Sequence, residues 1–210
     1  MAHFNLEEQE QIAKVKYFWN DWGIYLIILA VVLVVGYIGS TAYNWHQQSQ
    51  AQKAAVVYNT FTTALNSADN KGMYKAADNL IADLPSTEYA GLAAMQAAKV
   101  AFAAKDYALA DKYLVWAKDN ASDKSLQSLA VLRLASVYID QNKFDEARKL
   151  LLTKHDLAFD GLFYEARGDM YVAKGDLAKA RDAYKEGLQK AANDPSTGQA
   201  IQMKLDIIGN

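Results

Sequence analysis

The stretch from residue 23 to residue 43 reads GIYLIILAVVLVVGYIGSTAY and contains no aspartate, glutamate, lysine or arginine. The run without these charges is longer still and extends from Trp22 to Gln52. The hydrocarbon core of a bilayer is about 30 Å thick, and a helix that rises ~1.5 Å per residue crosses it in roughly 20 residues. Lipid offers no hydrogen-bond partner to an open backbone, so a segment that crosses it alone must be helical. We therefore predict a transmembrane helix over residues 23–43.

Aromatic residues flank this segment on both sides. Trp19 and Trp22 precede it, and Tyr43 and Trp45 lie at its end. Amphipathic rings prefer the headgroup level of a bilayer, where one end of the ring is apolar and the other is wet. We predict that these four residues lie at the two membrane interfaces.

Two other interpretations of the apolar run are a buried core helix and a cleaved signal peptide. A core helix of a small soluble domain rarely has so long an uncharged run. The triplet Ser40-Thr41-Ala42 resembles a cleavage site, but the apolar region of a signal peptide has only ~7–15 residues and follows a positive segment. The segment before this run carries four acidic residues and two lysines. Length and charge therefore favour a span that stays in the chain.

The distribution of basic residues predicts which side of the membrane each part occupies. Lys14 and Lys16 lie close before the span, whereas only Lys53 lies close behind it. Basic residues near a span are enriched on the cytoplasmic side. We expect residues 1–22 to form a cytoplasmic tail and residues 44–210 to form a periplasmic domain.

Composition excludes several classes of function. Residues 44–210 hold 20 basic and 20 acidic residues, so no net charge attracts nucleic acid or anionic lipid. The chain has no cysteine, which excludes disulfides, thiolate metal sites, a cysteine nucleophile and a lipid-modified cysteine. Only two prolines occur, and alanine, leucine and lysine are abundant, which favours helices.

The second half of the chain repeats a pattern centred on alanine. Ala77, Ala110, Ala147 and Ala180 are separated by 33, 37 and 33 residues, and apolar residues stand three before and four after each of them. An alanine in this position lets the two helices of a pair approach closely, because a larger side chain would force them apart. A period near 34 with two helices per unit is typical of a tetratricopeptide solenoid, and a generic helical bundle is the alternative.

The pattern also predicts the ends of the domain and the turns inside it. Turn-forming residues stand at 70–72, 105–106, 141–143 and 174–176, and an expanded loop stands at 119–124. The leading helix, near residues 51–67, continues from the membrane helix, with a hinge expected around residues 45–52 where glutamines cluster. Ile201, Leu205 and Ile208 follow Pro195 at helical spacing, which predicts a helix that caps the last unit. The fold class is thus all-α: an N-terminal transmembrane helix, then a tetratricopeptide-like α-solenoid of about four helix pairs with a C-terminal capping helix.

No catalytic arrangement is evident in the sequence. The three histidines, His3, His46 and His155, share no recognisable motif with possible partners, and single histidines are mostly surface residues. There is no glycine-rich phosphate loop and no nucleophile elbow. We predict no enzyme activity, no catalytic residue, no metal site and no cofactor.

The candidate working surface is the inner groove of the solenoid, which the first helix of each pair lines. An apolar groove crossed by a few charges, among them Lys99, can accept an extended or helical segment of a partner. The alternative is that the leading helix or the C-terminal cap fills it. The residues predicted to line the groove are Leu92, Met95, Phe102, Leu129, Leu132, Ile139, Leu162 and Val172.

The opening segment EEQEQIAKVKYFWNDWG, the span after it and the degenerate repeats resemble a known family over the whole chain. They look like the ancillary subunit of the SecYEG translocon, the YfgM-type proteins of Gram-negative bacteria. The resemblance implies a single-pass protein of the inner membrane with its domain in the periplasm. It also implies association with translocon subunits and with a membrane-anchored periplasmic chaperone of the prolyl-isomerase type, and help to unfolded secreted chains. The family has no catalytic residues to carry over.

Two functional hypotheses follow from these expectations. The first is a membrane-tethered interaction module at the Sec translocon that links translocation to periplasmic chaperones. The second is a membrane-anchored regulator whose cytoplasmic tail, residues 1–21, sequesters an envelope-stress signalling protein. Deletion of residues 1–18 separates them, because only the second depends on the tail.

Overall fold

The structure is a computed structural model that describes residues 6–209. Over that range it contains nine α-helices, one short 3-10 helix and no strand, so the predicted all-α class is confirmed. The chain divides into two compact units, one up to Ser49 and the other from Gln50 onwards. Each unit is described below by itself.

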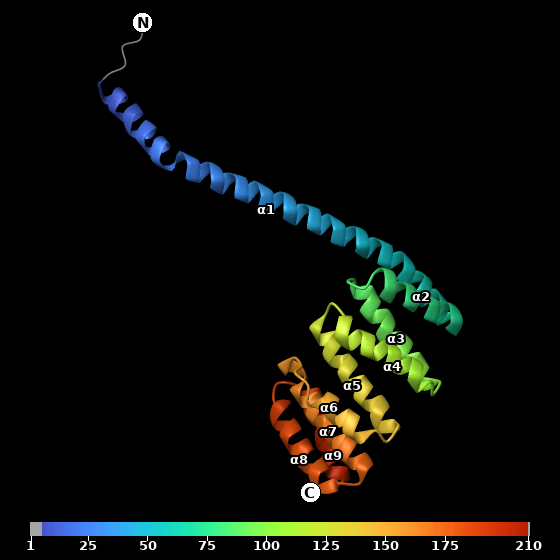
Figure 1. Ribbon diagram of the computed structural model, residues 1–210. Helices are drawn as coiled ribbons and strands as arrows, with labels where there is room; N and C mark the ends of the chain where they lie inside the picture. The colour runs from blue at the N-terminus through green and yellow to red at the C-terminus, as the bar shows by residue number, and fades with distance from the viewer. Residues whose placement is uncertain (1–5, 210) are drawn as a thin grey trace. The chain divides into compact units, whose positions relative to one another are not determined.

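Helix α1 (Leu6–Asn66) contains the apolar stretch and is the only described helix long and apolar enough to cross a membrane (Figure 1). The large apolar side chains from Ile24 to Ile38 are exposed and are not covered by other described parts of the protein. A core helix of a soluble unit would have these side chains covered by other elements. Their exposure over this length fits the predicted span.

The expected hinge around residues 45–52 does not interrupt the helix. Helix α1 passes through these residues, and the boundary between the two units falls within them, after Ser49. No proline or glycine occurs between Ser40 and Asn66, and glutamine is a good helix former. The leading helix of the domain is therefore the last part of α1, as the sequence predicted.

The unit from Gln50 onwards is built from the end of α1 and eight further helices. From α2 onwards each helix packs mainly against its neighbours in the chain, and Figure 1 shows them succeeding one another from green to red. The helices are α2 (Asn70–Asp83), α3 (Glu88–Ala103), α4 (Tyr107–Asn120), α5 (Lys124–Asp140), α6 (Phe144–Leu151), α7 (Asp160–Lys174), α8 (Leu177–Lys190) and α9 (Pro195–Ile207). The 3-10 helix η1 (Leu157–Phe159) lies between α6 and α7.

The repeated alanines have the packing role that the sequence predicts. Ala77, Ala110, Ala147 and Ala180 are all fully buried, each on the second helix of its pair. The apolar residue four positions after each alanine lies on the same side, because 3.6 residues make one turn. These positions belong to three apolar clusters that follow one another along the domain.

Most of the predicted turns are present, and they use left-handed backbone. Lys105, Asn142 and Gly175 have positive φ values of 57°, 59° and 82°. After the first and third of these, Asp106 and Asp176 cap the following helix through their side chains. A residue with left-handed backbone ends one helix and lets the chain reverse, and the capping aspartate starts the next helix.

The first and the expanded turn differ from the prediction. Residues 70–72 belong to the first turn of α2, and the chain reverses two residues before Asn70, at Ala68, whose φ is 58°. Asp69 caps α2 by accepting a hydrogen bond from the backbone N–H of Gly72. Helix α4 extends to Asn120, so the loop before α5 is limited to residues 121–123.

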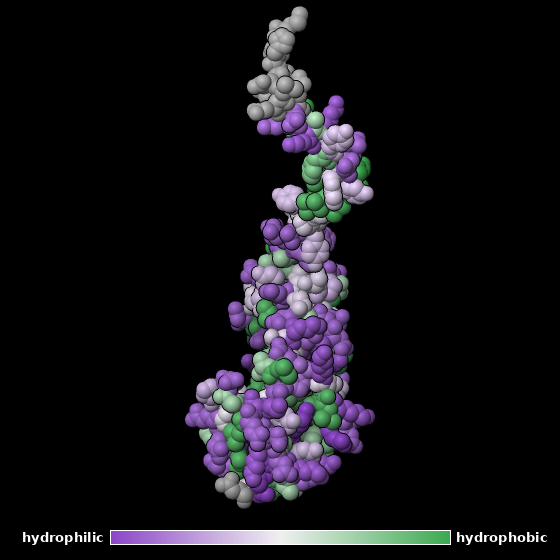
Figure 2. All heavy atoms as spheres, turned by 90° about the vertical axis from the view of Figure 1, so that its left-hand side faces the viewer, coloured by the Kyte–Doolittle hydropathy of each residue, from purple (hydrophilic) through white to green (hydrophobic). Residues whose placement is uncertain are grey.

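The C-terminal helix α9 covers the last pair. It packs on α8 and α7, with Ile201 and Leu205 in a cluster that also contains Ala180 and Tyr184. The exposed residues of α9 include Gln199, Gln202 and Asp206 together with Met203 and Ile207. Figure 2 shows one face of the protein, on which hydrophilic surface is interrupted by hydrophobic patches. The predicted capping helix is therefore present.

Candidate functional site

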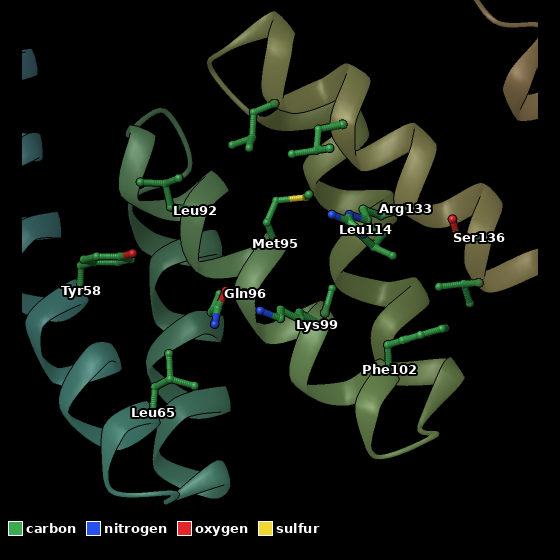
Figure 3. Close-up of a pocket in the computed structure, with 14 residues that line it drawn as sticks. Tyr58, Leu65, Leu92, Met95, Gln96, Lys99, Phe102, Leu114, Arg133 and Ser136 are labelled. Carbon is green, nitrogen blue, oxygen red and sulfur yellow. The ribbon is translucent and has the colours of Figure 1, made fainter. Parts of the chain in front are cut away.

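The Gln50–Asn210 unit contains an open groove of about 630 Å³ between α3 and α5. The end of α1 forms one side of it with Tyr58 and Leu65, and Leu114 of α4 also contributes. Figure 3 shows these side chains around the groove. Most of the lining is apolar, and the volume is in the usual range for ligand sites of ~300–1,000 Å³.

Helix α3 divides its surface between packing and the groove. The packing side consists of small residues that are almost fully buried: Ala90, Ala93, Ala94, Ala97, Ala98, which also borders the groove, and Ala101. Alanine lets neighbouring helices approach closely, which leaves the bulkier side chains for the other side. Leu92, Met95, Lys99 and Phe102 stand there at helical spacing and line the groove.

Helix α5 has apolar residues on two sides, and only one side faces the groove. Leu126, Leu129, Arg133, Ser136 and Val137 line the groove. The other side of α5 packs with α6 and α7, because the solenoid continues there.

Half of the predicted groove residues line the groove. Leu92, Met95 and Phe102 of α3 and Leu129 of α5 are brought together there. The other four predicted residues, which do not line it, are Leu132, Ile139, Leu162 and Val172. Leu132 is buried in a second apolar cluster with Ala147, Leu151 and Phe163, and Ile139 and Leu162 pack against that cluster.

The remaining residue, Val172, is exposed on α7 outside the groove. The groove described here is shorter than the predicted one and extends over α3 and α5. The groove is shorter because Leu132 lies on the side of α5 that packs against the next helix pair.

The charges of the groove are all positive. Lys99 and Arg133 line it, Gln96 and Ser136 are its other polar side chains of the two main helices, and no aspartate or glutamate is among its lining residues. Among residues 10–209, neither Lys99 nor Arg133 has an ion-pair partner.

Sequence reasoning named Lys99 but missed Arg133. The available signal was a charged residue four positions after Leu129, on the helical stripe that was expected to be apolar.

Two acidic residues of α7 bind the C-terminal helix α9. The Lys204 ammonium of α9 lies 2.7 Å from a carboxylate oxygen of Glu165 and 2.7 Å from one of Asp169. Burial by itself would lower the pKa of Lys204, but the hydrogen bonds and charges of these two carboxylates outweigh burial and raise it. The three residues fix α9 on α7.

The His155 side chain packs and makes polar contacts near the start of α7. Its ring stacks on Phe163 with centroids 3.6 Å apart, and its Nε2 lies 2.9 Å from Oδ1 of Asp160. Its Nδ1 lies 2.8 Å from the carbonyl oxygen of Thr153. Among residues 10–209, no group of three or more histidine, aspartate or glutamate side chains is arranged to hold a metal ion.

The four aromatic residues assigned to the membrane interfaces all lie on α1. Trp19, Trp22, Tyr43 and Trp45 are each more than half exposed. They flank the exposed apolar side chains, as an interface position requires.

Comparison with known proteins places the whole chain in one family. A family model described as a tetratricopeptide repeat-like domain matches residues 16–210. A protein of Neisseria gonorrhoeae named "Ancillary SecYEG translocon subunit" is 34% identical over 97% of this chain and 98% of its own length. The chain belongs to the family of ancillary SecYEG translocon subunits.

Other members of this family match with similar coverage. The proteins of the same name from Aggregatibacter actinomycetemcomitans and Escherichia coli are each 28% identical, over 97% and 95% of this chain. The matches include the exposed apolar stretch of α1 as well as the helix pairs. The resemblance found in the sequence and the predicted tetratricopeptide-like fold are confirmed.

Proposed function

We propose that this protein is a membrane-tethered, non-enzymatic interaction module that associates with the Sec translocon. The observation that carries the proposal is the match to proteins named as ancillary SecYEG translocon subunits over 97% of the chain. A tetratricopeptide-like array suits this role because stacked helix pairs present a long surface to partners.

The proposed location is the inner membrane, with α1 as the single anchor. Residues 23–43 cross the bilayer, residues 1–22 form the cytoplasmic tail, and residues 44–210 lie in the periplasm. Lys14 and Lys16 before the span support this orientation, because basic residues near a span favour the cytoplasmic side. The exposed apolar side chains from Ile24 to Ile38 support the anchor.

The proposed role of the domain is to link translocation to periplasmic chaperones. The resemblance in sequence implies a membrane-anchored chaperone of the prolyl-isomerase type as one partner, and unfolded secreted chains as another. The groove between α3 and α5 offers an apolar surface of the kind that accepts a segment of another chain.

Co-purification from solubilised membranes tests the association. We expect the tagged full-length chain to retain the three subunits of the translocon, identified by mass spectrometry. A matched control exchanges residues 23–43 for an unrelated apolar helix of equal length, which keeps the anchor and the domain. Absence of translocon subunits from the native chain under conditions that preserve the translocon itself would overturn the proposal.

A second candidate function is the tethered regulator that acts through its tail. It is favoured by one feature of α1, which presents Ile12, Val15, Trp19 and Trp22 as exposed apolar side chains before the span. Deletion of residues 1–18 decides between the two. If translocon association survives the deletion, the interaction module is supported. If the deletion abolishes this association and also the binding of a soluble cytoplasmic partner, the regulator is supported.

A further inference from the structure

The groove between α3 and α5 combines an apolar lining with unpaired positive charge. Leu92, Met95, Phe102 and Leu129 contribute apolar surface, and Lys99 and Arg133 contribute the only charged side chains of the lining. In the described part of the chain no carboxylate pairs with either cation. In the same part of the chain five lysines, among them Lys112 and Lys204, do have an acidic partner.

The two cations come from opposite walls. Lys99 belongs to α3 and Arg133 to α5, and both are exposed. In the view of Figure 3 the Lys99 side chain extends towards Gln96 and the Arg133 guanidinium points towards Met95. A chain segment lying along the groove would pass between them.

We propose that this groove binds an apolar segment of a partner polypeptide that carries acidic side chains. The inference rests on the proposed function, because it names the chemistry that the interaction module would recognise. Apolar residues of the segment would bury against Met95, Phe102 and Leu129. Its carboxylates would pair with Lys99 and Arg133.

The two positive charges make the groove more selective than a purely apolar groove would be. A neutral segment would cover Lys99 and Arg133 without offering an opposite charge, and an uncompensated charge taken out of water is costly. A basic segment would add repulsion to this cost. Complementary charge therefore discriminates among partners as well as guiding their approach.

The lining also argues against a free phosphate or a nucleic acid as the occupant. A phosphate or a nucleic acid would use the two cations and leave the surrounding apolar side chains without a partner. Nucleic-acid sites need many more positive charges along a strand than the two that this groove provides. A polypeptide satisfies both components of the lining.

Peptide binding to the full-length chain in lipid nanodiscs tests the proposal. Three fluorescent peptides share one frame of leucine and alanine and differ only at three positions, which are glutamate, glutamine or lysine. Fluorescence anisotropy measures each dissociation constant, with empty nanodiscs as the background. We expect the glutamate peptide to bind about fivefold more tightly than the glutamine peptide, as two partly exposed ion pairs allow, and the lysine peptide to bind most weakly.

The decisive variant reverses both charges, Lys99→Glu with Arg133→Glu. Both side chains are exposed, so the helices are expected to be retained, which circular dichroism checks. The order of the peptides should then invert, with the lysine peptide tightest. A matched control, Lys71→Glu with Arg148→Glu, changes the same charges at exposed positions outside the groove and should keep the original order.

Three results would overturn the inference. The first is equal affinity for the glutamate and glutamine peptides, and the second is an unchanged order in the reversed variant. The third is a peptide-free dimer that the reversed variant lacks in light scattering, because the groove would then hold a second copy of the chain. The translocon test above is independent, since its readout is co-purification and not peptide affinity, so the two proposals fail separately.

Discussion

At the scale of single residues, Gly168 lies directly against the ring of Tyr184. A Cβ atom on Gly168 would overlap the ring of Tyr184 at Cδ1 and Cε1. The ring cannot move easily, because Tyr184 is buried and its hydroxyl donates a hydrogen bond of 2.7 Å to Asp169. Glycine at this position therefore allows α7 and α8 to pack.

We expect Gly168→Ala to lower the free energy of unfolding by about 1–3 kcal/mol, as overpacked core substitutions do. Gly198→Ala on α9 is the control, because its Cβ would meet only the carbonyl oxygen of Ala191 at 3.9 Å. That change should be neutral or stabilise the domain by up to ~1 kcal/mol through helix propensity. Urea unfolding followed by circular dichroism measures both, and equal effects would contradict the explanation.

Two buried tyrosines predict how stability changes in alkaline solution. Burial, and then hydrogen bonds to Asp78 and Asp169, raise the pKa values of Tyr113 and Tyr184 above the ordinary value. The unfolded chain ionises its tyrosines near pH 10, whereas the folded chain keeps these two neutral. Their contribution is therefore complete below about pH 10 and is lost as the pH rises further.

The free energy of unfolding should fall above about pH 10, and Tyr113→Phe with Tyr184→Phe should make the fall shallower. At pH 7 the double variant should be less stable by about 1 kcal/mol for each hydroxyl hydrogen bond removed. Urea unfolding at a series of pH values checks both parts. An identical alkaline slope in the two proteins would assign the fall to other groups.

At the scale of elements, α9 closes the apolar end of the array. Ile201 and Leu205 cover the last pair, and Lys204 binds Glu165 and Asp169 of α7. An array of helix pairs needs such a cap, since its last pair otherwise exposes an apolar side.

We expect Lys204→Met to destabilise the docking of α9 by about 1 kcal/mol, because the three charged groups are partly exposed. Hydrogen exchange of the α9 backbone should become faster while exchange in α3 and α4 stays unchanged. Lys190→Met is the control, because Lys190 lies 3.8 Å from its partner Asp160 and is about half exposed. Equal acceleration by both changes would mean that the Lys204 contacts do not hold the cap.

The helix pairs were predictable from the sequence because their signal is local. Ala77 and its counterparts must be small wherever two helices cross, so the spacing of alanines shows the pairs directly. The turn at Ala68 was missed because alanine is an unusual residue for left-handed backbone, and the neighbouring Asn70 and Gly72 are better turn formers.

The lining of the groove was only half predictable. Helix α5 is apolar at Leu129 and also at Leu132, and helical periodicity cannot say which of the two faces the groove. Only the position of α7 decides it, because Phe163 takes Leu132 into the next cluster. Arg133 was overlooked for the same reason, since its side of the helix was not known to be the inner one.

At the scale of the whole molecule, the absence of cysteine makes orientation measurable with single reporters. We expect Ser122→Cys, in the loop before α5, to react with a membrane-impermeant maleimide in intact spheroplasts. Ala13→Cys should react only after the membrane is broken. Both positions are exposed, so accessibility depends on the side of the membrane. The opposite labelling pattern would place the domain in the cytoplasm.

The neighbour-to-neighbour packing of α2 to α9 bears on how the domain is made. The main contacts join helices that are adjacent in the chain, such as α3 with α4 and α7 with α8. An array of this kind can nucleate in one place and grow by one repeat at a time, without long-range closure. A domain that emerges from a pore with its N-terminal end first can therefore build itself in the order of its emergence, and the arrival of α9 completes it.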